Sequence, residues 1–119
     1  MKRNVFLAVA FSFTATALLI IGCTKSPGSQ SAYTEDCSGA AKSFAKDVNP
    51  IIQTYCTKNS RCHAEGSRDG VLTTYQGIYN ERNPIYSDVQ SGRMPNDGSL
   101  TAAQRNTILC WISNGATNN

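Results

Sequence analysis

Two thiols and the only histidine of the chain lie close together in the sequence. Cys56 precedes Cys62 by six residues, and His63 follows directly. This arrangement suits covalent haem attachment, because each sulfur adds across one vinyl group and the imidazole then serves as the proximal iron ligand. The usual spacing is C-x-x-C-H, whereas this chain has C-x5-C-H. We expect the extra residues, Thr57 to Arg61, to form a polar loop that preserves the Cys-His adjacency.

A methionine is the candidate for the second axial ligand. Met94 is the only methionine besides Met1, and it lies in the stretch Gly92-Arg93-Met94-Pro95. A thioether is a soft, neutral ligand that favours reduced iron and raises its potential. Gly92 lets the backbone approach closely, and Pro95 stiffens the chain on the far side. This loop is therefore suited to presenting the thioether to a haem.

Each of these residues also has a use without haem. From spacing alone, Cys56 and Cys62 suit a short disulfide loop in a secreted domain equally well. With His63 and one more cysteine they reach the ligand number of a zinc site, although the spacing matches no familiar zinc module. A lone histidine is more often a surface loop residue, and Met94 alone is more often an apolar gap filler. Three arginines would ordinarily be solvated, although each could steer a partner or face haem propionates: Arg61, Arg68 and Arg93.

The beginning of the chain has the pattern of a bacterial lipoprotein signal. Residues 1–22 combine a basic start with a long apolar stretch, and they end in a glycine that is followed by Cys23. Small and apolar residues before a cysteine resemble a lipobox, in which the cysteine sulfur is lipidated and becomes the mature N-terminus. The alternative is a transmembrane helix, because the apolar run is close to the roughly 20 residues that a span needs. The basic start and the polar sequence after Cys23 favour the signal.

Loss of this signal changes the charge balance and sets the compartment. Lys2 and Arg3 leave with it, so nine of the 11 basic residues remain against 8 acidic ones. A nearly neutral protein has no basic field for nucleic acid, so we expect no nucleic-acid partner. We expect a lipid anchor to hold the protein at the cell envelope, either facing the periplasm or on the outer membrane. Disulfides and covalent thiol chemistry persist in that compartment.

The rest of the chain divides into a tether and one small domain. Residues 23–42 contain a stretch rich in Ser, Thr, Gly and Pro, which predicts a lipidated flexible tether. Residues 43–117 predict the domain, since a chain of 119 residues has room for only one. Aromatic residues make up only 8% of the chain, so an apolar core alone would be thin. We expect a disulfide framework, a cofactor or both to fill the centre.

Apolar periodicity and end signals predict an all-α fold. The best-defined helix begins with a capping box of Thr101 and Gln104 and ends at Asn114-Gly115. An earlier helix of about 10 residues has Asp47 as its N-cap and ends near the first of the two cysteines. A start before Asp47 would put Pro50 in the helix interior, where proline is costly. No segment alternates like a strand, and two short helices complete the expected set, over residues 74–79 and 84–90.

Taken in this order, the pieces resemble a small class I cytochrome c, in particular the lipoprotein cytochromes of the Bacteroidetes type, whose cysteine spacing is often stretched. The likeness covers roughly residues 43–117. It is carried by the stretch before the first cysteine, by Cys62-His63, by Arg93-Met94-Pro95 and by the ending Trp-Ile-Ser-Asn-Gly-Ala. The resemblance implies N- and C-terminal helices packed around one haem c, with long loops between them and His63 and Met94 as axial ligands. It also implies electron transfer with a redox partner protein rather than enzyme activity.

The five cysteines have separate uses under this hypothesis. Cys23 takes the lipid, Cys56 and Cys62 take the haem, and Cys37 and Cys110 remain to form a disulfide. The alternative is a disulfide-stapled, non-haem surface lipoprotein that acts as a protein-interaction module, in which Cys56 and Cys62 are also paired. A haem enzyme with an open site is a third hypothesis, which a methionine at the distal position disfavours. The odd cysteine count thus supports the anchor, and the haem depends on the histidine and the methionine.

Overall fold

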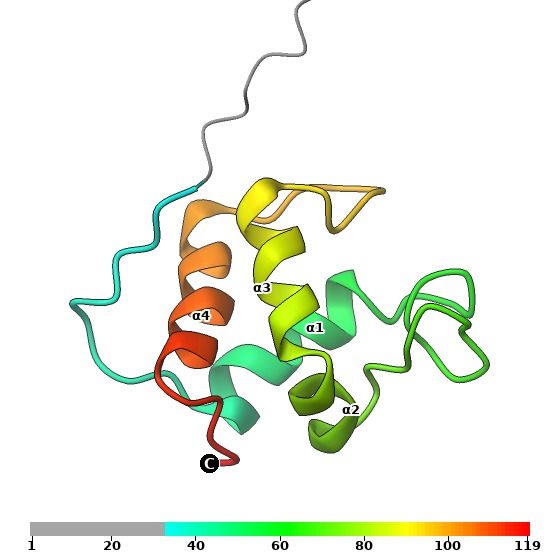
Figure 1. Ribbon diagram of the computed structural model, residues 1–119, viewed down its shortest axis with the longest axis horizontal. Helices are drawn as coiled ribbons and strands as arrows, with labels where there is room; N and C mark the ends of the chain where they lie inside the picture. The colour runs from blue at the N-terminus through cyan, green and yellow to red at the C-terminus, as the bar shows by residue number, and fades with distance from the viewer. Residues whose placement is uncertain (1–32) are drawn as a thin grey trace, which may run out of the picture.

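Helices joined by long loops make up the part of the chain that the structure describes (Figure 1). The structure is a computed structural model that describes residues 33–119; the predicted signal and Cys23 lie outside the described residues. Residues 33–119 contain no strand, which confirms the all-α prediction. No helix in this range has the length and hydrophobicity needed to span a bilayer. The elements are η1 (Phe44–Val48), α1 (Asn49–Tyr55), α2 (Tyr75–Asn80), α3 (Arg82–Ser91) and α4 (Ala102–Ser113).

The first helical segment begins earlier than the sequence predicts. Its N-cap is Ser43, whose hydroxyl accepts a hydrogen bond from the Lys46 amide at 3.3 Å, while the Ser43 amide donates to the Asp47 carboxylate at 2.8 Å. A π turn follows, in which the Val48 amide reaches back five residues to the Ser43 carbonyl at 3.2 Å. We attribute this wide turn to Pro50, which cannot donate a hydrogen bond and whose ring clashes with the carbonyl four residues earlier in a regular helix. The predicted N-cap at Asp47 is therefore wrong.

The last helix has the ends that its sequence predicts. The Thr101 hydroxyl accepts from the Gln104 amide at 3.2 Å, and the Gln104 side-chain oxygen accepts from the Thr101 amide at 2.9 Å. These two bonds confirm the capping box. At the other end, Gly115 has a φ of 96°, and the amides of Gly115 and Ala116 donate to carbonyls of the last turn at 3.0 and 2.9 Å. This Schellman motif ends α4 and turns the chain back over it.

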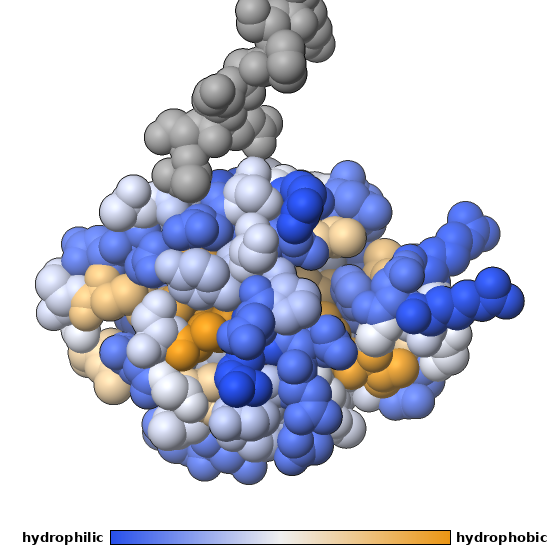
Figure 2. Space-filling model, in the orientation of Figure 1, coloured by the Kyte–Doolittle hydropathy of each residue, from blue (hydrophilic) through white to orange (hydrophobic). Residues whose placement is uncertain are grey.

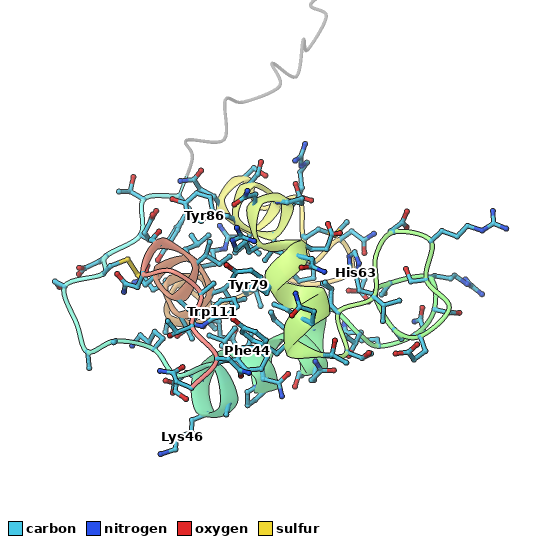
Figure 3. All side chains as sticks on the ribbon, turned by 60° about the horizontal axis from the view of Figure 1, so that its bottom comes forward. Phe44, Lys46, His63, Tyr79, Tyr86 and Trp111 are labelled. Atoms are coloured by element: carbon cyan, nitrogen blue, oxygen red, sulfur yellow. A yellow bond between two sulfur atoms is a disulfide. The ribbon has the colours of Figure 1, made fainter. Side chains whose placement is uncertain are left out.

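An aromatic cluster joins the first and last helical segments (Figure 3). Trp111 of α4 is 1% exposed, and its ring lies 5.5 Å from that of Phe44 in η1. Phe44 also meets Tyr75 of α2 edge to face, with 5.0 Å between the ring centroids. The Tyr75 hydroxyl donates to the Ala116 carbonyl at 2.9 Å, beyond the end of α4. The N- and C-terminal segments of the domain therefore pack against each other, and Trp111 belongs to the core.

The two short helices lie where the sequence predicts: α2 is shifted by one residue, and α3 is slightly longer than expected. Thr74 caps α2, since its hydroxyl accepts from the Gly77 amide at 3.1 Å. Pro84 lies in the first turn of α3, where the missing amide proton costs little. Gly92 ends α3 with a φ of 75°, a backbone conformation that glycine adopts without strain. α3 packs along α4 and directs Val89 into the core.

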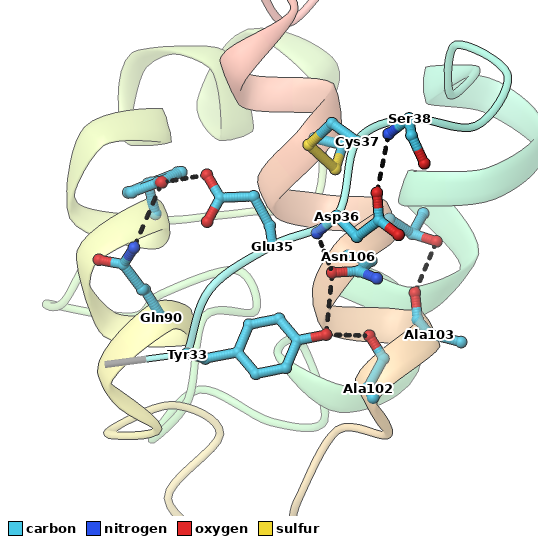
Figure 4. The surroundings of a disulfide bond; sticks show 12 residues. Tyr33, Glu35, Asp36, Cys37, Ser38, Gln90, Ala102, Ala103 and Asn106 are labelled. Atoms are coloured by element: carbon cyan, nitrogen blue, oxygen red, sulfur yellow. Dashed lines mark hydrogen bonds between the residues drawn. A yellow bond between two sulfur atoms is a disulfide. The ribbon is translucent and has the colours of Figure 1, made fainter. Parts of the chain in front are cut away.

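The segment before the first helix lies against α3 and α4 (Figure 4). The Tyr33 hydroxyl donates to the Asn106 side chain at 2.8 Å, and the Tyr33 amide donates to the carbonyl at the end of α3 at 3.2 Å. Tyr86 of α3 donates to the Glu35 carboxylate, and this hydrogen bond lowers the pKa of Glu35. The prediction of a flexible tether over residues 23–42 does not anticipate these contacts, which hold its described part to the domain. We refer to residues 33–37 as the strap.

A disulfide completes the attachment of the strap. Cys37 and Cys110 are bonded, with 1.97 Å between the sulfur atoms, and Cys110 lies within α4. The two residues are 73 positions apart in the sequence, so the bond ties the start of the domain to its last helix. This is the pair that the cysteine count leaves for a disulfide.

Candidate functional site

One cavity brings the predicted site residues together. It lies between the helices and the two loops that join α1 to α2 and α3 to α4, and its volume is about 140 Å³. This volume is below the range of about 300–1,000 Å³ that is typical of small-molecule and cofactor sites. Cys56, Cys62, His63 and Met94 all line the cavity, although they come from three separate segments. Apolar side chains from the helices and from the first loop form much of its wall: Ile52, Leu72, Ile85, Val89 and Ile108.

The chain between the two cysteines forms a closed loop. The His63 amide donates to the Cys56 carbonyl at 2.9 Å, so the loop returns to the point where it began. Inside it, the Cys62 amide donates to the Asn59 carbonyl at 3.0 Å. Residues 58–61 are exposed, and Figure 2 shows hydrophilic side chains extending into solvent on the side of the molecule where the loops lie. The expected polar bulge is present, and the long spacing keeps Cys62 and His63 beside Cys56.

Three hydrogen bonds fix His63, which lies where the long loop meets the helices (Figure 3). Besides its amide bond, its carbonyl accepts from the Leu72 amide at 2.8 Å, and its ring Nδ1 lies 3.1 Å from the Gly70 carbonyl oxygen. A carbonyl oxygen can only accept, so Nδ1 carries the proton of the neutral ring and Nε2 keeps its lone pair. This is the usual support of a metal-ligating histidine, because the hydrogen bond fixes both the tautomer and the orientation of the ring.

Burial governs the thiol of Cys56. It raises the pKa of this thiol to about 11, and the neighbouring Cys62 acts in the same direction as a smaller cause. The thiol is therefore protonated at neutral pH. A catalytic cysteine needs the opposite shift, produced by nearby positive charge or a helix N-terminus. Cys56 is thus not prepared for nucleophilic catalysis.

The loop that carries Met94 is held at both ends. The Met94 amide donates to the Asp88 carbonyl at 3.2 Å, and Arg93 forms an ion pair with the Asp88 carboxylate. Further along the loop, Asp97 forms an ion pair with Lys58 at 3.1 Å. Both side chains of that pair are partly exposed, so the pair stabilises the fold by about 1 kcal/mol at most. Its geometry matters more, because it joins the two loops that carry the predicted axial ligands.

The three arginines have different places. Arg61 lines the cavity, Arg93 forms an ion pair with Asp88 of α3, and Arg68 is exposed. Sequence reasoning missed the Gly70 carbonyl that holds the imidazole, because a backbone acceptor has no side-chain signal. It also missed the acidic side chains at the cavity, because they are far apart in the sequence and share no spacing: Asp69, Glu81, Asp88 and Asp97.

The other uses proposed for the thiols have less support in the described residues. Cys56 and Cys62 are both free thiols rather than a disulfide. Cys37 and Cys110 are bonded to each other, so neither is available as a further zinc ligand. Within residues 33–119, no three or more His, Cys, Asp or Glu side chains are grouped so as to hold a metal ion.

Comparisons of the chain with family models, with curated proteins and with solved structures find no match.

Proposed function

We propose that the protein is a monohaem c-type cytochrome that carries electrons at the cell envelope. One observation carries this proposal: Cys56, Cys62, His63 and Met94, all selected from the sequence, line a single cavity. The packing of η1 against α4, with long loops around the cavity, supports a fold of the class I cytochrome c type. Electron transfer to or from a redox partner protein is the corresponding function.

The thiols and walls of the cavity suit one covalently bound haem c. Cys56 and Cys62 would hold it through thioether bonds, in which a sulfur–carbon bond forms at a vinyl group and the thiol proton moves to the other vinyl carbon. This addition needs no oxidant and no leaving group, but it needs free thiols, and both cysteines are free. The apolar part of the wall would contact the cofactor face. When bound, the haem supplies one-electron redox chemistry.

The two remaining residues would ligate the iron. His63 offers Nε2, since Nδ1 is engaged with the Gly70 carbonyl. Met94 offers its thioether from the loop between α3 and α4, which is held by the ion pair across to the cysteine loop. If His63 and Met94 both held the iron, no ligand position would remain for a substrate. Electron transfer therefore fits these residues better than a haem enzyme does.

The cellular setting is proposed from the start of the sequence. A lipid on Cys23 would anchor the protein to a membrane at the cell envelope, with the domain facing the periplasm or carried on the outer membrane. The strap, residues 33–37, would then set where the tether leaves the domain, because it is bound to α3 and α4. The near-neutral charge of the chain after residue 22 provides no basic field for nucleic acid.

Replacement of Met94 by alanine tests the proposal at the iron. The low-spin spectrum should give way to one with an open sixth position that binds carbon monoxide, and the reduction potential should fall, because the soft thioether favours reduced iron. Visible absorption and a redox titration measure both effects. The protein should come from a host with its own haem-attachment machinery, since C-x5-C-H is unusual. Ser99→Ala, an exposed change in the same loop, is the matched control.

Two outcomes would count against this account. A Met94→Ala variant with the spectrum and potential of the unchanged protein would mean that the sixth ligand is another residue. Native protein that carries no haem and has Cys56 and Cys62 joined in a disulfide would instead support the protein-interaction module.

A further inference from the structure

One polar side chain links α1 to the loop segment beside His63. Gln53 is half-buried in α1, and its side-chain NH2 group makes two hydrogen bonds. Nε2 donates to the Leu72 carbonyl at 2.9 Å and to the Asn49 side-chain oxygen at 3.0 Å. The Thr57 hydroxyl lies 3.0 Å from Oε1 and 2.9 Å from the Gln53 backbone carbonyl, so these two oxygens share its single proton. Both amide protons are used, so the orientation of this side chain is fixed.

The same loop segment holds His63 at two points. Gly70 accepts from the ring Nδ1 at 3.1 Å, and the Leu72 amide donates to the His63 carbonyl at 2.8 Å. Leu72 therefore binds His63 through its amide and Gln53 through its carbonyl. Residues 70–72 therefore connect the Gln53 side chain to the carbonyl that holds the imidazole.

Helix α2 supports this segment from another direction. A Cβ atom built on Gly77 would lie 2.3 Å from the Val71 carbonyl oxygen, far inside contact distance. The backbone of α2 thus lies directly on the segment, and only glycine fits there. Leu72 is 3% exposed, so its side chain fixes the segment in the core as well. Residues 70–72 are held by packing on one side and by the Gln53 side chain on another.

We propose that Gln53 is a positioning residue for His63. By holding residues 70–72, it keeps the ring proton on Nδ1 and so presents the Nε2 lone pair to the cavity. Gln53 does not itself line the cavity and acts through the backbone of the segment. The inference deepens the proposed function and rests on it only for the use of Nε2 as an iron ligand.

The single histidine of the chain makes a direct test possible. Protein prepared without haem and labelled with nitrogen-15 gives one imidazole, whose two nitrogen shifts report the tautomer. At about pH 8, where an ordinary imidazole is neutral, the Nδ1–H form should dominate. In Gln53→Leu the ratio of the two tautomers should fall about fivefold, the value of a typical hydrogen bond. Gln76→Leu, on the exposed face of α2, is the matched control and should leave the ratio unchanged.

A milder variant covers the case in which Gln53→Leu does not fold. Asn49→Ala removes the oxygen that accepts from Gln53 Nε2 at 3.0 Å, so the tautomer ratio should fall part of the way. Circular dichroism establishes that the wild-type protein without haem and each variant are folded. A folded Gln53 or Asn49 variant with the tautomer ratio of the wild-type protein would overturn the inference, and so would a wild-type protein in which the Nε2–H form dominates.

The haem-bound protein gives a second, separate readout. The hydrogen bond from Nδ1 to the Gly70 carbonyl makes the imidazole a stronger electron donor to oxidised iron. Loss of this hydrogen bond in Gln53→Leu should therefore raise the reduction potential. A potential equal to that of Gln76→Leu would contradict the positioning role. Because the tautomer is measured without haem, absence of haem attachment would defeat the proposed function while the tautomer result still decides the role of Gln53.

Discussion

Replacement of His63 by alanine should abolish the low-spin haem spectrum. His63 is the only imidazole in the chain, and its Nε2 is the nitrogen ligand that the cavity offers. Visible absorption at equal protein concentration measures the loss, and intact mass shows whether covalent attachment also fails.

The control for this variant lies in the same loop. Arg68→Ala changes an exposed side chain and should leave the spectrum as it is. Far-ultraviolet circular dichroism separates loss of a ligand from loss of the fold. A His63→Ala protein that retains a low-spin spectrum would mean that the iron is held elsewhere, and the assignment of the cavity would be wrong.

Removal of the Cys37–Cys110 disulfide should have the largest effect on stability. The bond joins residues 73 positions apart, and chain-entropy models give about 4 kcal/mol for a loop of this length. Small domains are stable by about 5–15 kcal/mol in all, so the expected loss is a large share of the total. Urea unfolding of Cys37→Ala, Cys110→Ala protein measures the free energy of unfolding, with a steeper denaturant dependence as the unfolded chain expands.

Single variants provide the control for the disulfide. Cys37→Ala alone breaks the same bond at an exposed position, so it should give most of the loss of the double variant. Ser38→Ala, next to it and exposed, should change stability little. A loss below about 1 kcal/mol in the double variant would mean that the strap is held to α4 chiefly by the hydrogen bonds of Tyr33 and Asn106.

Local signals made the last helix predictable. The capping box of Thr101 and Gln104 and the stop after Asn114 depend only on neighbouring residues, so the sequence contains the whole pattern. The start of the first helix, by contrast, depends on residues far away in the sequence. The Ser43 hydroxyl and the Phe44 amide both bind Asn119, 76 and 75 residues away, and Pro50 adds the π turn. An end that is completed by a distant segment cannot be found from periodicity.

The strap is a second case in which contacts with distant residues override what local sequence predicts. Its composition predicts a tether, because few side chains in it can be buried. Tyr33 nevertheless packs on the helices and binds Asn106, 73 residues away, while Glu35 accepts from Tyr86. One aromatic ring and one carboxylate with distant partners hold this polar segment together with the disulfide, and neither of those two partners is visible from local sequence.

Residue type and spacing pointed to the side chains of the candidate site but not to the groups that support them. Spacing and residue type selected the two cysteines, His63 and Met94, and the fold brings them to one cavity. The groups that orient them act through the backbone or through a distant charge. Gly70 contributes only a backbone carbonyl. Lys58 and Asp97, which are 39 positions apart in the sequence, form the ion pair that joins the two loops.

The most direct test of the central claim is the intact mass of the native protein after denaturation, read beside its visible spectrum. The account predicts a chain heavier by one haem that stays attached under denaturing conditions, together with a Soret band. Attachment through Cys56 or Cys62 alone would retain the cytochrome but show that the wide spacing has lost one thioether. A chain without added haem mass and without a Soret band would contradict the account.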